Sequence, residues 1–365
     1  MEPRRSAIFA RFAALVVALA AGAQIGCAWL GPRSIRSARA DYNDAVTATD
    51  AEQLLGTIVR VRYGEPSSLL AVSSITASMH FTAMGGAEFG VGRASNYAGN
   101  LTPLSAGASF EENPTISYTP VQGEKYLRQL LAPVPLDVAL LLLGAFENSP
   151  DVMRLLLRSV NGIQNGGLLP DAAGPGDERF ERLADALATL ARDGHVEWVQ
   201  HTGATPGFAL LLEGEGDRYR QQFAALHELL GLALPRRIGR TTRIPIATGA
   251  GPDDGLRLRT RSLYELFAIA AASVEVPAEE RARSVGPALP ENPSAAGGIY
   301  IHCSEDEPTN AMTAVERRGY WYWIDATDAG SKLVFRMLSA LMSVQMSDAA
   351  NGDHARPLLT VPVSR

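Results

Sequence analysis

Apolar and polar residues alternate almost perfectly from Ser74 to Met84, and this period of two predicts a half-buried β-strand. Other stretches repeat their apolar residues every three or four positions, as amphipathic helices do. Further strands are predicted at 104–110, 115–119, 195–199, 208–212, 256–261, 299–303, 311–317, 320–325 and 358–363. Helices are predicted at 49–64, 124–131, 136–143, 150–160, 180–191, 219–232, 262–273 and 332–346.

Local signals place the ends of several predicted elements. Thr49 begins a Thr-x-x-Glu capping box, and Ser262 begins a Ser-x-x-Glu box. Ser149 precedes a proline, which is the order of an N-cap followed by the first helical turn. Pro114 and Pro120 are predicted to bound the strand between them, because proline cannot donate to a ladder.

Strands and helices follow one another irregularly, which favours an α+β fold with mostly antiparallel strands over a doubly wound parallel sheet. The middle segment is predicted to be mainly helical and the C-terminal region mixed. We expect a signal peptide at 1–26, a lipidated tether at 27–40, an α+β region with the helical middle at 41–255 and an α+β region at 256–365.

The N-terminus has the layout of a secretory signal. Three arginines precede an apolar stretch at 13–23, which is shorter than the roughly 20 residues of a membrane-spanning helix. Gly26 before Cys27 resembles a bacterial lipobox, whose cysteine is acylated and becomes the mature N-terminus. Gln24 departs from that pattern, and Ala21-Gly22-Ala23 offers an ordinary cleavage site, so secretion or an uncleaved anchor stays open.

Acylation of Cys27 would make the lipid bilayer a permanent partner, since each buried methylene contributes about 0.8 kcal/mol. Ala28 follows the cysteine in place of the Asp that retains lipoproteins at the inner membrane, which favours the periplasmic face of the outer membrane. The alternative address is a secreted or soluble periplasmic protein.

Charge weakly disfavours nucleic acid as a partner. The net charge is −6, and phosphate binding needs a concentrated basic face. Two arginine clusters, at 236–243 and 257–261, have acidic neighbours and are interpreted as solvated faces. The helix end at Arg60 and Arg62 is interpreted in the same way. The two cysteines cannot form a disulfide framework, and Cys303 is expected to be a buried thiol.

The best candidate surface is the sequence YWYWID and the residues that follow it. In a strand the two tyrosines share one face and the two tryptophans the other, and ring faces suit sugars or partner side chains. The favoured interpretation is that the rings pack inside the protein. The acidic residues, which include Glu316, are then expected to form turns or helix caps. The possible partner or glycan surface comprises Tyr320, Trp321, Tyr322, Trp323, Asp325, Asp328 and Lys332.

No catalytic motif is found. The sequence lacks a G-x-S-x-G elbow, an S-x-x-K pair and a C-x-x-C pair, and its six histidines form no H-E-x-x-H motif. We therefore expect no cofactor and no metal site, and catalysis is left open as the less favoured case.

Six stretches of the chain are similar to a set of predicted proteobacterial lipoproteins. The resemblance runs from about residue 40 to the C-terminus and implies export and lipidation. It carries no catalytic residue across. The stretches are DYN (41–43), EQLLGTIVRVRYGEP (52–66), SFEENPTISYTPVQGEKYLRQLLAPVP (109–135), RSVNGIQN (158–165), LRTRSLYELF (258–267) and RRGYWYWIDATDAGSKLVF (317–335).

These observations predict a membrane-anchored lipoprotein that acts as a non-catalytic scaffold or assembly factor of an envelope complex. One alternative is an oligomeric outer-membrane pore built from hairpins in 74–118, since a spanning strand needs about 9–11 alternating residues. The other is a periplasmic glycan-binding protein or hydrolase. An envelope protein partner is expected, while its identity and the oligomeric state stay open.

Overall fold

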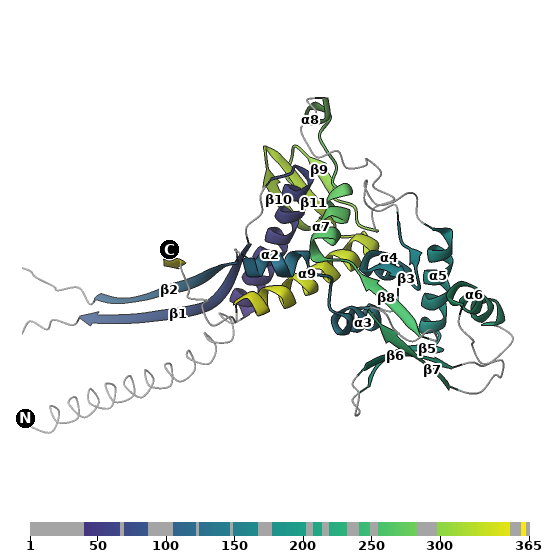
Figure 1. Ribbon diagram of the computed structural model, residues 1–365. Helices are drawn as coiled ribbons and strands as arrows, with labels where there is room; N and C mark the ends of the chain where they lie inside the picture. Colours follow the sequence, from purple (N-terminus) through teal and green to yellow (C-terminus); the bar gives the residue numbers. More distant parts are fainter. Residues whose placement is uncertain are drawn as a thin grey trace, which may run out of the picture. The chain divides into compact units, whose positions relative to one another are not determined.

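The structure, a computed structural model, has an α+β fold (Figure 1). The chain divides into two units, residues 1–53 and residues 54–365. The described residues are 40–65, 69–86, 105–121, 124–146, 149–166, 177–201, 207–213, 219–231, 241–248, 255–282, 298–350 and 359–362. The expected signal peptide, Cys27 and residues 87–104 and 283–297 lie outside them.

The first described helix covers residues 40–62, nine residues earlier than predicted. The Thr49 capping box is therefore wrong, because this hydroxyl donates inside the helix to the carbonyls of Ala45 (3.0 Å) and Val46 (2.9 Å). In the second unit, the predicted apolar face of residues 54–59 is buried. Arg62 is only 5% exposed, so the expectation of a solvated helix end is wrong for this arginine.

A long antiparallel ribbon follows. β1 (Leu69–Gly86) pairs with β2 (Ser105–Val121) along its whole length, and β12 (Leu359–Pro362) adds a short third strand beside β2. The strands predicted at 74–84 and 358–363 are confirmed. The two strands predicted at 104–110 and 115–119 are one continuous strand.

Proline does not bound β2 as predicted, because Pro114 and Pro120 both lie within it. β12 pairs with β2 only between Thr115 and Tyr118. Both prolines lie just outside that interval, where β2 has a single described neighbour, and the even spacing between them directs both backbone nitrogens to the same edge. A proline on an open strand edge removes no ladder hydrogen bond.

The middle of the chain contains α2 (Glu124–Leu131), α3 (Leu136–Ala145) and α4 (Pro150–Leu156). α4 is shorter than predicted, because β3 (Leu157–Val160) follows it and forms a hairpin with β4 (Ile163–Gln164). The turn is Asn161-Gly162, with positive φ at both residues. This dipeptide is a strong hairpin signal that outweighs the helical spacing of the apolar residues before it.

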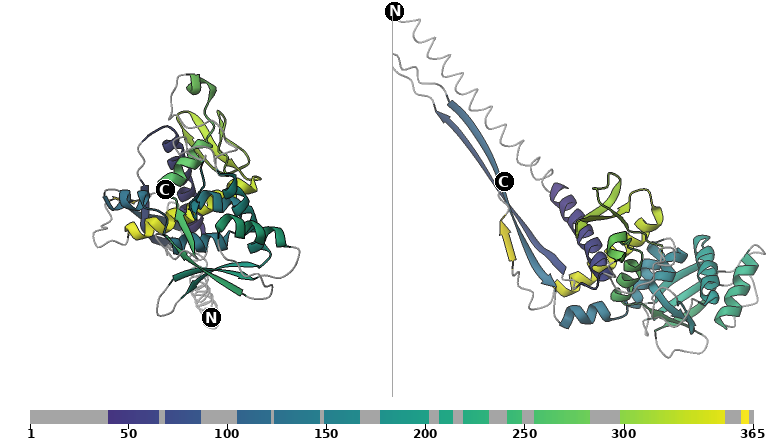
Figure 2. Two further views of the ribbon diagram at one scale, coloured as in Figure 1. Left: turned by 45° about the vertical axis from the view of Figure 1, so that its right-hand side comes forward. Right: turned by 90° about the horizontal axis from the view of Figure 1, so that it is seen from above.

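A six-stranded sheet has the order β4-β3-β8-β7-β6-β5. Its remaining strands are β5 (Val196–His201), β6 (Gly207–Glu213), β7 (Thr241–Ala247) and β8 (Leu256–Thr260), so the regions on both sides of residue 255 contribute to it. Strand β7 was not predicted. α5 (Glu178–Arg192) contacts both edge strands, and α6 (Arg220–Leu230) packs beside α5 (Figure 2).

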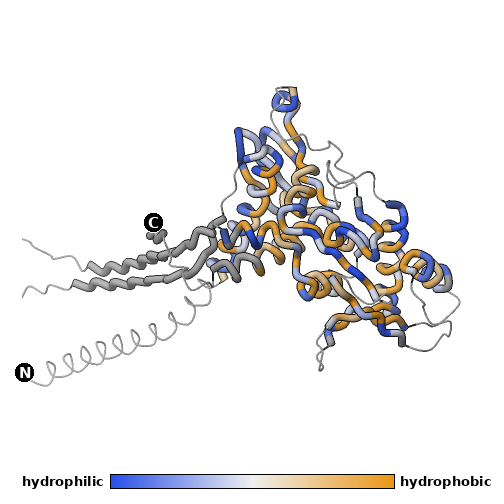
Figure 3. The backbone as a smooth tube through the Cα atoms, viewed as in Figure 1, coloured by the Kyte–Doolittle hydropathy of each residue, from blue (hydrophilic) through white to orange (hydrophobic). Residues whose placement is uncertain are grey.

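The C-terminal part contains α7 (Leu263–Ala272), α8 (Ala278–Ala282) and α9 (Ala329–Ala350). α7 is drawn largely in orange in Figure 3, and nearly all its residues are buried. β9 (His302–Ser304), β10 (Ala311–Arg317) and β11 (Tyr320–Asp325) form an antiparallel sheet in the order β10-β11-β9. The strands predicted at 311–317 and 320–325 are confirmed, and the strand predicted at 299–303 begins three residues later than expected. Among the described helices, none is both long and apolar enough to cross a membrane.

The capping box of α7 provides a stability test with an internal control. The Ser262 hydroxyl accepts from the Glu265 backbone N–H at 3.2 Å, whereas Ser149, the N-cap residue of α4, forms no side-chain cap hydrogen bond. We predict that Ser262→Ala lowers the free energy of unfolding by about 1 kcal/mol in urea titrations. Ser149→Ala should change it by clearly less, and equal losses would contradict the assigned caps.

Candidate functional site

The candidate surface from the sequence lies on the β10-β11-β9 sheet, which has two different faces. Tyr322 and Ile324 are fully buried on one face, while Trp321 and Trp323 are half-buried on the other. Gly56 in the helix of residues 40–62 contacts the inner face, since a Cβ added there would lie 3.9 Å from Val315. The alternation along β11 therefore places one ring of the cluster in the core.

A row of aromatic rings lies on the other face. The Trp323 ring stacks on His302 at a centroid distance of 4.5 Å, and His302 meets Tyr300 edge-on at 4.5 Å. Neighbouring strands explain the first contact, because Trp323 and His302 are paired in the register of β11 and β9. This row presents ring edges and partly covered ring faces, and the glycan surface stays a prediction.

Tyr322 is tied to the end of the helix of residues 40–62. Its hydroxyl lies 2.6 Å from the hydroxyl of Tyr63, and burial raises the pKa of both phenols. The hairpin tip beside them is Arg318-Gly319, with φ of 57° and 81°. The Arg318 guanidinium lies 4.7 Å from the centre of the Tyr63 ring.

Two carboxylates hold this hairpin tip. Arg318 donates to Glu280 (2.9 Å) and Glu65 (3.1 Å), and Arg317 also donates to Glu65 (2.8 Å). A left-handed conformation costs a non-glycine residue about 1–2 kcal/mol. The three charge-assisted hydrogen bonds and the ring contact offset that cost.

The remaining predicted site residues form turns and caps. The Asp325 carboxylate accepts from the backbone and hydroxyl of Thr327, each at 2.7 Å, and these bonds lower the pKa of Asp325. Asp328 accepts from the backbone N–H (3.1 Å) and hydroxyl of Ser331 at the start of α9, and Lys332 donates to the Ala326 carbonyl (2.9 Å). These contacts support the turn and cap interpretation for Asp325 and Asp328 over paired carboxylates for glycan hydrolysis. The interpretation is wrong for Glu316, which is exposed within strand β10.

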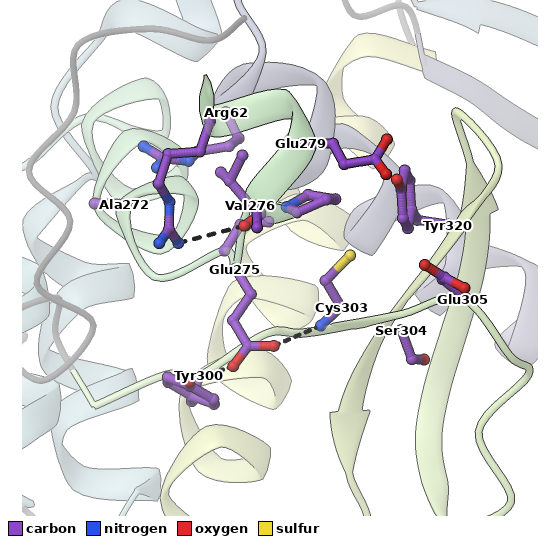
Figure 4. Close-up of a pocket in the computed structure, with 14 residues that line it drawn as sticks. Arg62, Ala272, Glu275, Val276, Glu279, Tyr300, Cys303, Ser304, Glu305 and Tyr320 are labelled. Atoms are coloured by element: carbon purple, nitrogen blue, oxygen red, sulfur yellow. Dashed lines mark hydrogen bonds between the residues drawn. The ribbon is translucent and has the colours of Figure 1, made fainter. Parts of the chain in front are cut away.

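A pocket of about 420 Å³ opens beside β9 (Figure 4). Its walls come from four separate stretches: Arg62, the segment from Ala272 to Arg281, residues 300–305 around β9, and Tyr320 in β11. Figure 4 shows Glu275 at one end, next to Tyr300 and Cys303. Glu279, Glu305 and Tyr320 gather at the other end.

Glu275 organises this pocket. Its carboxylate accepts from the Tyr300 hydroxyl and from the Cys303 backbone N–H (2.8 Å), and it lies 3.7 Å from His302 Nδ1. The hydrogen bond to Glu275 raises the pKa of Tyr300. Glu275 thus fixes the wall strand β9 and one end of the aromatic row at once.

The groups in the pocket suit binding better than covalent chemistry. Burial raises the pKa of the Cys303 thiol to about 11, so the thiol stays protonated near neutral pH and is a poor nucleophile. Three glutamates and two arginines line the walls, an arrangement for a polar ligand of mixed charge. In the described part of the chain, no cluster of three or more His, Cys, Asp or Glu residues could hold a metal ion.

Sequence reasoning identified Tyr320 on this wall but missed Glu275, Tyr63 and Glu65. Nothing in the local pattern distinguishes these residues, because their partners lie 25 to 259 positions away. The interpretation of the 257–261 cluster as solvated is wrong for Arg261, which is 2% exposed and donates to the Asn165 carbonyl (2.8 Å). Burial lowers the pKa of Arg261 to about 10.

Comparison of the chain with protein-family models, curated proteins and solved structures found no match.

The Cys303 thiol gives a direct test of this environment. In a Cys27→Ser variant Cys303 is the sole cysteine. We predict that its alkylation by iodoacetamide follows a pKa near 11 in the folded protein, since burial disfavours the thiolate. In urea the same thiol should titrate near the unperturbed value of about 8.5. Cys303 is half-buried, not fully buried as expected, and a folded-state value at or below about 8.5 would contradict the pKa rise assigned to this burial.

Proposed function

We propose that this chain is a lipid-anchored protein of the bacterial envelope, and that its folded part is an assembly module. The sequence supports the anchor through the secretory signal that ends at Cys27. The observation that carries the assembly role is the β1–β2 ribbon, whose long edges are open in the described residues.

The edges of this ribbon are unusually long. The two strands stay paired from Leu69 with Val121 to Gly86 with Ser105, which corresponds to about 55 Å at 3.4 Å per residue. No described strand pairs with the outer edge of β1, and β12 covers β2 only at Thr115–Tyr118.

Open edges of this length favour pairing with another chain. Each unpaired strand edge presents backbone N–H and C=O groups that template a further strand, and proteins normally shorten, charge or cover such edges. A two-stranded hairpin by itself is marginally stable in water. Strand addition by a partner stabilises the ribbon and joins the two proteins, which is the function of an assembly module.

The anchor is tested by replacing the cysteine. Cys27→Ser should move the protein from the membrane fraction to the soluble fraction after signal removal, because no acyl chain can be attached. Cell fractionation with immunoblotting, and mass spectrometry of the wild-type N-terminal peptide, provide the measurements. An unmodified sulfur at Cys27 in the wild type would overturn the anchor.

The open edge is tested by photo-cross-linking in cells. A photoreactive residue placed at Thr76 or Ser78 in β1 should give a discrete product with one envelope protein or with a second copy. The matched control is Glu178, an exposed position at the start of α5, which should give none. If the β1 positions behave like Glu178, the ribbon is not an assembly edge.

The length of the ribbon also favours a second candidate, an oligomeric pore. The strands far exceed the about 9–11 residues that a membrane-spanning strand needs. The two candidates differ in the Cys27→Ser variant. A pore would stay in the membrane after carbonate extraction and form SDS-resistant multimers that are lost on deletion of 74–118, whereas an anchored assembly module would be released.

A further inference from the structure

A second pocket, here called the strand-end groove, lies in the six-stranded sheet beside the point where β7 ends and β8 continues. β7 and β8 form its parallel pair, matched only at Ile246 with Leu256 and at Ala247 with Arg257, while the other neighbouring pairs are antiparallel. β8 therefore continues to Thr260 beyond the end of β7. Crevices at the carboxyl ends of diverging parallel strands are favoured places for ligands.

The linker between α2 and α3 forms the opposite wall of the groove. It is fixed to the end of β8, because Val134 N–H donates to the Arg261 carbonyl (2.9 Å) and the Thr260 hydroxyl donates to the Val134 carbonyl (2.7 Å). The resulting groove has a volume of about 1100 Å³. That exceeds the upper end of the range of about 300–1,000 Å³ found for small-ligand pockets.

The lining of the groove combines apolar residues with a positive charge. Its apolar part includes Pro133, Leu136, Phe208 and Ile246, and none of the described residues that line it is Asp or Glu. Two arginines do line it, although acidic residues outnumber basic ones in the whole chain. This composition fits a ligand with an apolar body and an anionic head.

The two arginines differ in whether they form an ion pair. Arg158 is 58% exposed and pairs with Glu265 at 3.1 Å. Arg259 is exposed, and its guanidinium forms no ion pair with any described residue. An unpaired guanidinium beside an apolar wall is well suited to a phosphate, which it binds with two parallel hydrogen bonds.

Two exposed leucines lie on the helices that the linker joins. Leu131, the last residue of α2, is 59% exposed, and Leu141 in α3 is 72% exposed, which makes them the two most exposed large apolar side chains in the described residues. Apolar side chains beside a basic site are typical of surfaces that rest on a lipid headgroup layer.

We propose that the strand-end groove binds one anionic phospholipid, with its phosphate at Arg259 and acyl carbons against Phe208, Ile246 and the α2–α3 linker. The choice of a phospholipid over other amphipathic anions rests on the membrane location in the proposed function. The groove shares no lining residue with the pocket beside β9.

The test uses the chain from residue 27 onward with Cys27→Ser, which retains every described residue and carries no acyl chain. It should sediment with phosphatidylglycerol vesicles and bind phosphatidylcholine vesicles much more weakly. Arg259→Ala should weaken binding to phosphatidylglycerol about fivefold, because one basic residue near an anionic surface contributes about 1 kcal/mol. The matched control is Arg243→Ala, which removes an exposed arginine of β7 outside the groove and should have no effect.

A groove is distinguished from general adhesion by a lipid that forms no bilayer. Monomeric dihexanoyl-phosphatidylglycerol should bind with one-to-one stoichiometry in calorimetry, and Thr248→Trp, which fills the exposed rim of the groove, should abolish that binding while circular dichroism stays unchanged. Equal losses in Arg259→Ala and Arg243→Ala would overturn the proposal, as would the absence of monomeric binding. A lipid-free dimer that Thr248→Trp dissociates would show that a second copy occupies the groove. None of these outcomes depends on acylation, so they leave the anchor to be judged separately.

Discussion

The buried hydroxyl of Tyr322 is the constraint on which the C-terminal half of the structure depends. A phenol with no exposed surface loses its hydrogen bonds to water, and without a partner that loss costs about 1–3 kcal/mol. Tyr63 supplies the partner at 2.6 Å from a position 259 residues earlier in the chain. The end of the helix of residues 40–62 is thereby fixed against β11.

The same junction determines the pocket beside β9. Glu65 and Glu280 meet Arg317 and Arg318 at the hairpin tip, so α8 and the segment that leads to it are held close to the tip. Arg62 precedes Tyr63 on the helix end and becomes part of the wall. Loss of the Tyr322 contact would therefore loosen both the wall at Arg62 and the hairpin tip, so Tyr322, the buried ring of the YWYWID sequence, serves packing.

The sequence predicted elements well where their hydrogen bonds are local. The α7 capping box joins residues three positions apart, and the β10–β11 hairpin turns within two residues. Prediction from the sequence failed where a residue far along the chain determines the local structure. Residues after Leu156 fit a helical period, yet β8 pairs with them as a strand about a hundred positions later. The tolerance of β2 for Pro114 depends on where β12 ends, and Glu275 acquires its role from Tyr300 and Cys303.

The two hollows differ in charge. Three glutamates and two arginines line the pocket beside β9, whereas the described lining of the strand-end groove has two arginines and no acidic residue. Removal of residues 1–26 deletes three arginines and one glutamate, which takes the net charge from −6 to −8. An acidic body is repelled by an anionic bilayer within a Debye length of about 8 Å, so an acyl anchor alone would hold it near the membrane without a preferred face. A groove whose described charged residues are all basic would give the protein a preferred face, because attraction to phosphate can turn that face toward the lipid.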